Sequence, residues 1–134
     1  MGAWEVRVLI DSSAWIDFLR EGCSKRADVA TLLKSGSAVL CPVTWAELWS
    51  GVRGKREETV LLHIREVCGW LEIDDTVWES AAMLGRVARG QGVNCPLTDV
   101  LVVVCARHHG TEILHRDKHI DELLALSDKP PTQQ

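Results

Sequence analysis

Short apolar runs alternate with amphipathic stretches along the chain. Runs that stop after three or four residues predict buried strands, and they lie at Val8–Ile10, Ala38–Cys41, Leu71–Ile73 and Glu112–Leu114. Apolar residues at helical spacing predict helices between them, over Ser13–Leu19, Ser24–Lys34, Thr44–Trp49, Glu57–Cys68, Thr76–Arg89, Val100–His109 and Ile120–Leu126. Because strands alternate with helices, the pattern predicts β-α-β crossovers and an α/β fold with one parallel sheet covered on both faces.

Two segments depart from simple amphipathicity. Val100–His109 is dense in valine, which predicts a helix buried on most sides. Gly51–Glu58 is polar and punctuated by glycine, and we expect it to be a link that presents Arg53, Lys55 and Arg56.

Length and composition favour a single domain. The chain has 134 residues, of which 46% are hydrophobic and 25% charged, and we expect one domain over residues 1–128 followed by a polar, disordered tail over 129–134. No stretch approaches the roughly 20 apolar residues of a membrane helix, and the N-terminus lacks the pattern of a signal peptide. We therefore expect a soluble, cytoplasmic protein that does not associate with membranes.

The cysteines and the net charge limit the chemistry. The five cysteines are odd in number, widely spaced and without a C-x-x-C pair, which argues against a disulfide framework and a zinc cage. A net charge of −4 normally counts against nucleic acid as a partner. That objection weakens if four of the acids surround a metal, because the rest of the surface is then neutral.

Four acids stand where a parallel sheet would bring them together. Asp11 and Asp117 follow predicted strands, and Glu47 and Asp99 stand near the starts of predicted helices. These junctions share one edge of a parallel sheet, where ligands bind in open α/β folds. Clustered carboxylates repel one another unless a cation lies between them. Oxygen ligands favour Mg²⁺, with Mn²⁺ as a second choice, and such ions commonly act on phosphate esters.

Each acid also has a structural explanation. Asp11 alone is equally suited to cap the helix that follows it. Thr44–Glu47 matches the S/T-x-x-E capping box, and Asp99 complements a helix dipole. The joint pattern of four acids favours one site over four separate explanations.

The residues around these acids resemble the PIN-domain ribonucleases, and more narrowly the VapC toxins of bacterial toxin–antitoxin pairs. The resemblance rests on four segments in order that span nearly the whole chain, Val8–Asp17, Thr44–Leu48, Gly92–Ala106 and Ile113–Leu123. It implies a three-layer α/β/α sandwich with a central parallel sheet of four to five strands. It also implies a Mg²⁺-dependent endoribonuclease that inhibits translation and growth, forms a homodimer and is neutralised by a small cognate antitoxin.

Carried over by position, the resemblance implies roles for individual residues. The catalytic metal ligands would be Asp11, Glu47, Asp99 and Asp117. Hydrolysis of the RNA phosphodiester would leave 5′-phosphate and 3′-hydroxyl ends. The residues that we expect to contact the substrate are Ser12, Ser13, His115, Arg53, Lys55 and Arg56.

Two departures from the family pattern keep a second hypothesis open. His115 stands where the family often has Thr or Ser, and His119 followed by Ile120 stands where it often has Asp and then Phe. A second metal position is therefore in doubt, and Asp121 is a candidate substitute. The alternative is a PIN-fold module that binds RNA or an antitoxin without cleaving. A receiver-like phosphoacceptor domain is disfavoured because Asp11 is followed by serines and not by further acids.

Overall fold

The computed structural model describes residues 6–21 and 26–127. The polar tail predicted over 129–134 lies outside them, as does part of the helix predicted to begin at Ser24. Within the described ranges, no helix combines the length and the apolar character needed to cross a lipid bilayer. The four cysteines in this part of the chain, Cys41, Cys68, Cys95 and Cys105, are free thiols.

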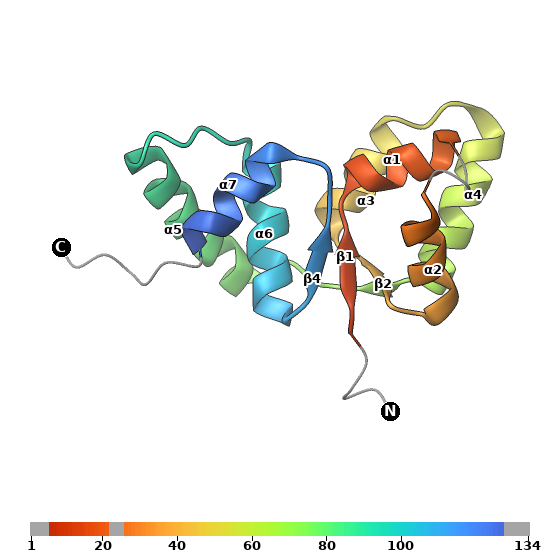
Figure 1. The fold of residues 1–134 in the computed structure, drawn as a ribbon, viewed down its shortest axis with the longest axis horizontal. Coiled ribbons are helices and arrows are strands. Elements are labelled where there is room, and N and C mark those ends of the chain that lie inside the picture. Colours follow the sequence, from red (N-terminus) through yellow and green to blue (C-terminus); the bar gives the residue numbers. More distant parts are fainter. Residues whose placement is uncertain (1–5, 22–25, 128–134) are drawn as a thin grey trace.

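A four-stranded parallel sheet forms the centre of the molecule. Its strands are β1 (Val8–Ile10), β2 (Ala38–Leu40), β3 (Gly69–Trp70) and β4 (Glu112–Leu114), in the spatial order β3-β2-β1-β4. In the centre of the sheet, Leu9 of β1 pairs with Val39 on one side and Ile113 on the other. All pairings are parallel, so the carboxyl ends of the strands share one edge, the upper edge in Figure 1.

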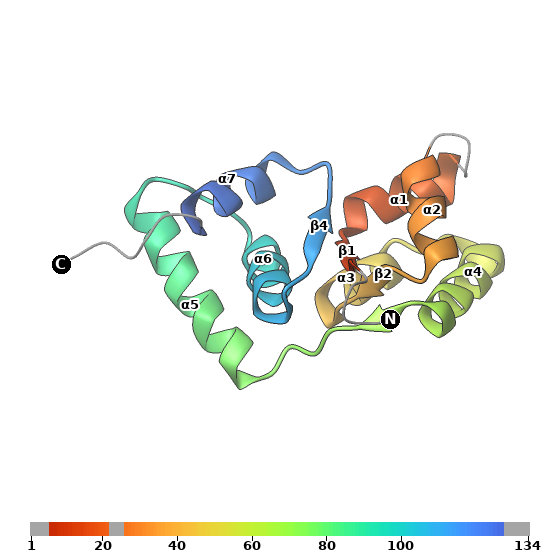
Figure 2. The same cartoon turned by 60° about the horizontal axis from the view of Figure 1, so that its bottom comes forward.

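Helices cover both faces of the sheet. Figures 1 and 2 show one group of helices on each side of the sheet. The first group is α1 (Ser12–Glu21), α2 (Ala27–Ser35), α3 (Pro42–Ser50) and α4 (Gly54–Val67), and the second is α5 (Asp75–Gly90), α6 (Leu97–His109) and α7 (Lys118–Ser127). The predicted three-layer α/β/α sandwich is confirmed.

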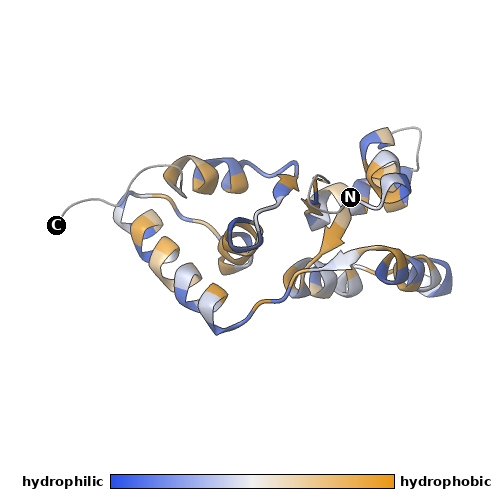
Figure 3. Cartoon of the chain, turned by 90° about the horizontal axis from the view of Figure 1, so that it is seen from below, coloured by the Kyte–Doolittle hydropathy of each residue, from blue (hydrophilic) through white to orange (hydrophobic). Residues whose placement is uncertain are grey.

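The alternation of side chains along the strands divides the core in two. Leu9 and Val39 pack into a cluster with α5, α6 and α7, whereas Ile10 and Leu40 pack with α1, α2 and α4. Successive strand residues point to opposite faces, so three-residue strands serve both clusters. Figure 3 shows β1 as an apolar strand between the two helical layers. Helix α6 is buried continuously from Asp99 to Ala106, which confirms the helix predicted to be enclosed on most sides.

Two predicted segments differ from the structure in ways that the local contacts explain. The third strand is Gly69–Trp70 and not Leu71–Ile73. A Cβ on Gly69 would lie 2.9 Å from Cγ1 of Val39, so the absence of a side chain allows the close approach to β2. The link predicted over Gly51–Glu58 ends early, because α4 already begins at Gly54. The Glu57 carboxylate accepts a hydrogen bond from the Arg53 N–H at 2.7 Å, which supports this early start.

Candidate metal centre

Asp11 ends β1 and begins α1. Its backbone N–H donates to the carbonyl of Leu114 at 2.9 Å, which ties the ends of β1 and β4 together. Its Oδ2 accepts hydrogen bonds from the N–H and the hydroxyl of Ser13, at 3.3 and 2.8 Å. The residue is only 3% exposed. Asp11 therefore caps α1, as the structural alternative held, and at the same time places a buried carboxylate at the sheet edge.

Glu47 lies in the second turn of α3, one turn later than predicted. The predicted capping box between Thr44 and Glu47 is wrong, because Cys41 is the N-cap and the Thr44 hydroxyl accepts from the Cys41 N–H at 3.2 Å. Glu47 instead accepts a hydrogen bond from the Ser12 hydroxyl at 2.9 Å. Its side chain therefore turns toward β1 and takes no part in capping its own helix.

The electrostatic surroundings of Glu47 link it to the other acids. Burial raises the pKa of Glu47, and the negative charges of Asp11 and Asp117 raise it further. Hydrogen bonds from the hydroxyls of Ser12 and Thr98 oppose this rise. Glu47 also forms part of the wall of a largely apolar pocket of about 410 Å³ beside Thr98 and Trp78.

Asp99 is buried in the first turn of α6. Pro96 is the N-cap of this helix and its carbonyl accepts from the Asp99 N–H at 3.1 Å. Burial raises the pKa of Asp99 to about 6, and the charges of Asp117 and Asp11 contribute to the increase. A carboxyl in this environment gains from a nearby cation, since a positive charge would favour its ionised form.

Asp117 follows β4 and precedes α7. Its Oδ1 accepts the N–H of His119 at 2.8 Å, so the carboxylate caps α7. The Asp117 N–H donates to Nδ1 of His115 at 3.1 Å. Nε2 of His115 lies 3.2 Å from the Asp121 carboxylate. His115 therefore holds the turn that carries Asp117, and Asp121 faces His115.

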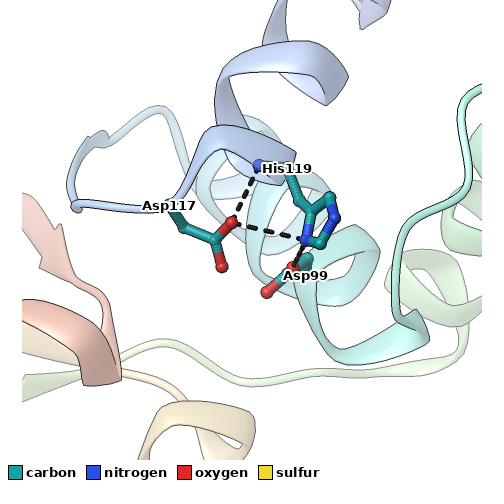
Figure 4. Close-up of side chains that lie close together, drawn as sticks. All are labelled: Asp99, Asp117 and His119. Carbon is teal, nitrogen blue, oxygen red and sulfur yellow. Dashed lines mark hydrogen bonds and ion pairs between the residues drawn. The ribbon is translucent and has the colours of Figure 1, made fainter.

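His119 is the imidazole of this centre. Figure 4 shows its Nδ1 facing two carboxylates, 3.5 Å from Oδ2 of Asp99 and 3.5 Å from Oδ1 of Asp117. One ligand atom from each of these three residues lies within 4.8 Å of the others. The sequence showed a histidine in place of a family acid, but it did not show that the ring would turn toward Asp99.

Basic side chains flank the acids in two places. Arg53, Lys55 and Arg56 are exposed around the start of α4, and both arginines line a groove of about 570 Å³ between α1 and α4. A second group was not predicted. Arg116 stands next to Asp117, its N–H donates to the Ser13 hydroxyl at 3.2 Å, and its guanidinium pairs with Asp17. Arg26 pairs with the same Asp17 carboxylate.

The donor set fits a divalent cation. Four carboxylates and one imidazole offer the oxygen and nitrogen ligands that Mg²⁺, Mn²⁺ and related ions accept. Two donors on one such ion stand about 3 to 4 Å apart, since each bond is about 2.0 to 2.3 Å long. The distances from Nδ1 of His119 to the carboxylates of Asp99 and Asp117, 3.5 Å each, fall in this range, and one ligand atom from each of the three residues lies within 4.8 Å of the others.

Comparisons with known proteins identify the family and the fold. The PIN domain family model matches residues 8–124. Ribonuclease VapC11 of Mycobacterium tuberculosis is 29% identical over 126 residues, covering 90% of this chain and 94% of the relative. Among solved structures, the DNA-bound VapBC of Salmonella typhimurium has a TM-score of 0.72 at 12% identity, and the match covers 87% of this chain and 91% of that one. VapC20 of Mycobacterium tuberculosis, described as a Sarcin-Ricin loop cleaving toxin, has a TM-score of 0.67 at 16% identity, and the match covers 86% of this chain and 93% of that one. With a family match over most of its length and the sheet and helix order described above, the chain belongs to the PIN-domain family.

Proposed function

We propose that this protein is a metal-dependent endoribonuclease and the toxin of a type II toxin–antitoxin pair. The observation that carries the proposal is the placement of four acids beyond the carboxyl ends of the strands. Asp11 follows β1 and Asp117 follows β4, the Ser12 hydroxyl links Glu47 to the start of α1, and Asp99 and Asp117 face the same nitrogen of His119 at 3.5 Å. The supporting finding is similarity over most of the chain to relatives named VapC ribonucleases.

In this proposal the four carboxylates hold Mg²⁺ or Mn²⁺. Such an ion polarises a phosphoryl oxygen and lowers the pKa of water, which favours hydrolysis of a phosphodiester. The chain's own part is to fix the carboxylates before substrate arrives. The Ser13 hydroxyl and N–H orient Asp11, and the Ser12 hydroxyl orients Glu47. His115 and the start of α7 fix Asp117.

Positive side chains would bind the RNA backbone. Arg116 is adjacent to Asp117, and its side chain is 62% exposed, so a phosphate can reach it. The predicted contacts from Arg53, Lys55 and Arg56 would extend the path across α4 toward α1. The Asp17 carboxylate pairs with Arg116 and so holds this guanidinium beside the turn that carries Asp117.

The partners in this proposal are a small antitoxin and a second copy of the chain. Solved structures of the same fold include VapBC from Salmonella typhimurium and FitAcB from Neisseria gonorrhoeae. On α5 the side chains of Trp78, Met83 and Val87 are between 44% and 60% exposed. A homodimer would cover such apolar side chains. Inhibition of translation and growth, relieved by the antitoxin, is the expected cellular result of RNA cleavage.

The alternative is a PIN-fold module that binds RNA or an antitoxin without cleaving. Its support is His119, which replaces a carboxylate with a neutral or positive ring and so weakens an all-oxygen magnesium site.

An RNA cleavage assay separates the two functions. Purified protein is incubated with RNA in Mg²⁺ or Mn²⁺ and in EDTA, beside Asp99→Asn and the matched control Asp75→Asn, an exposed acid on α5. The proposal predicts cleavage by the wild type and the control, with loss in EDTA and in Asp99→Asn. Cleavage that survives both EDTA and Asp99→Asn contradicts the metal-nuclease proposal. RNA binding without cleavage under all conditions supports the alternative.

A further inference from the structure

The side chain of His119 is placed between two carboxylates without forming a close hydrogen bond to either. Nδ1 stands 3.5 Å from an oxygen of Asp99 and 3.5 Å from an oxygen of Asp117. N–H···O hydrogen bonds are normally about 2.7 to 3.2 Å long, so both distances are longer than such a bond. They match the separation of donors that share one cation. We propose that His119 is a ligand of the metal and that it makes the centre prefer a first-row transition dication such as Mn²⁺ to Mg²⁺.

The backbone holds the ring in this position. The His119 N–H donates to Oδ1 of Asp117 at 2.8 Å, and the Cys95 thiol lies 3.8 Å from the His119 carbonyl. His119 is thus in the first turn of α7, tied to Asp117 and to the segment before α6. A ligand on a helix that is fixed from both sides needs little reorganisation to bind an ion.

The ring can also be reached from solvent. The His119 side chain is 36% exposed. It lines a groove of about 870 Å³ that is bordered by α5, the segment before α6 and α6 itself. Arg86, Arg89 and Asn94 line the same groove. The imidazole is therefore accessible to solvent, whereas Asp99 is buried.

The chemistry of the donors sets the preference. Mg²⁺ is bound mainly by oxygen, keeps several waters and gains little from imidazole. First-row transition dications bind imidazole nitrogen together with carboxylate oxygen and follow the Irving–Williams order. His119 places a nitrogen donor without a negative charge beside Asp99 and Asp117. This donor reduces the advantage of Mg²⁺. The inference rests on the proposed metal-dependent function and specifies its cofactor.

The competing explanation is that His119 acts as an internal cation in place of a metal. A protonated ring between Asp99 and Asp117 would neutralise them directly, and the charge of His119 does lower the pKa of Asp99. This explanation predicts weak metal binding in the wild type and stronger binding once the ring is removed. The two explanations therefore predict opposite results for the same substitution.

Metal binding and pulsed electron paramagnetic resonance test the inference without an activity assay. Mn²⁺ and Mg²⁺ are titrated by calorimetry into the wild type, His119→Asp and His119→Gln, with His63→Gln, at an exposed position of α4, as the matched histidine control. The Mn²⁺ complexes are then examined for coupling to an imidazole ¹⁴N. We expect ¹⁴N coupling in the wild type and in His63→Gln, and its loss in both His119 variants. We also expect the ratio of Mn²⁺ to Mg²⁺ affinity to fall about 10-fold or more in His119→Asp.

Three results would overturn the inference. They are bound Mn²⁺ without ¹⁴N coupling in the wild type, coupling that persists in both His119 variants, and absence of Mn²⁺ binding at millimolar concentration. The first overturns it even if RNA cleavage is intact, in which case the proposed function stands. Coupling in a protein that does not cleave RNA supports His119 as a ligand and removes the proposed function. Thermal melting of each variant checks its fold, and His119→Gln provides a second variant if His119→Asp does not fold.

Discussion

The two halves of the centre satisfy their carboxylates in different ways. On the hydroxyl side, formed by Asp11, Glu47, Ser12 and Ser13, serine hydroxyls donate to both acids at 2.8 to 2.9 Å. On the imidazole side, formed by Asp99, Asp117 and His119, the side chains face one another at 3.5 Å. Serine hydroxyls supply the donors in the first half. In the second half Asp117 accepts the backbone N–H of His119, and the 3.5 Å distances from the ring to both carboxylates suit a shared cation.

The difference in pKa follows from this arrangement. Asp99 has its pKa raised to about 6, mainly by burial and by its acidic neighbours. Glu47 experiences the same influences, but two hydroxyls oppose them. The comparison indicates that the hydroxyl side is prearranged by the fold, and we expect a bound cation to stabilise the imidazole side.

The largest expected effect comes from Asp99→Asn, which removes the most buried acid of the imidazole side. Loss of this ligand should lower RNA cleavage by about 100-fold or more. Substitution of a residue that only hydrogen-bonds a metal ligand already lowers metal affinity or activity by about 10- to 100-fold. The measurement is the initial cleavage rate at saturating metal, together with metal affinity by calorimetry. Unchanged cleavage in Asp99→Asn would place the chemistry outside the imidazole side.

Glu47→Gln tests the corresponding acid on the hydroxyl side. Gln keeps the hydrogen-bonding shape but removes the charge, and Glu47 takes no part in capping α3. We expect near-normal melting with cleavage reduced by about 10- to 100-fold. Glu79→Gln, at an exposed position of α5, is the matched control and should retain both properties. If Glu47→Gln retains full activity, Glu47 is not part of the site.

Ser13→Ala should have a smaller effect. The substitution removes the hydroxyl that donates to Asp11 and accepts from the Arg116 N–H, while the Ser13 N–H still reaches Asp11. We expect about a 10-fold loss of cleavage and about 1 kcal/mol lower unfolding free energy. Cleavage rates and urea unfolding measure the two quantities. Wild-type values for both would show that Asp11 is held by the backbone alone.

The smallest expected effect is the pH dependence of stability in metal-free protein. The pKa of Asp99 rises from 3.8 to about 6 on folding, so the folded state binds this proton more tightly than the unfolded state. Its contribution to stability is complete below about pH 4 and is lost as the pH rises through 6. Relative to Asp99→Asn, the wild type should gain about 1 kcal/mol between pH 7 and pH 5, measured by urea unfolding. A parallel pH dependence of the two proteins would contradict the raised pKa.

Much of this architecture could be predicted from the sequence because short apolar runs ending at acids are informative. Val8–Ile10 followed by Asp11 predicted both a central strand and the position of its carboxylate. The strand at Gly69–Trp70 could not be predicted, because it is two residues long and depends on the fit of Gly69 against Val39. Hydrophobic patterns predict which side chains are buried, whereas this strand is defined by the pairing of its backbone with β2.

At the candidate metal centre, too, part of the structure could not be predicted from the sequence. The capping box at Thr44 matched its pattern, yet the helix begins at Pro42, so Glu47 is too far along α3 to take part. Helix starts depend on where the chain leaves the preceding strand, which single residues determine only weakly. The role of His119 depends on the direction of its ring across the gap between α7 and α6, and this is a tertiary property that spacing does not encode.

The most direct test of the account is anomalous diffraction from crystals of the wild-type protein grown with Mn²⁺. The account predicts an anomalous peak within bonding distance of the carboxylates of Asp99 and Asp117, on the side of the His119 ring. Loss of the peak in crystals of Asp99→Asn would complete the assignment. A Mn²⁺ peak elsewhere on the molecule, with density between Asp99 and Asp117 explained by His119 alone, would contradict a metal centre at this edge of the sheet.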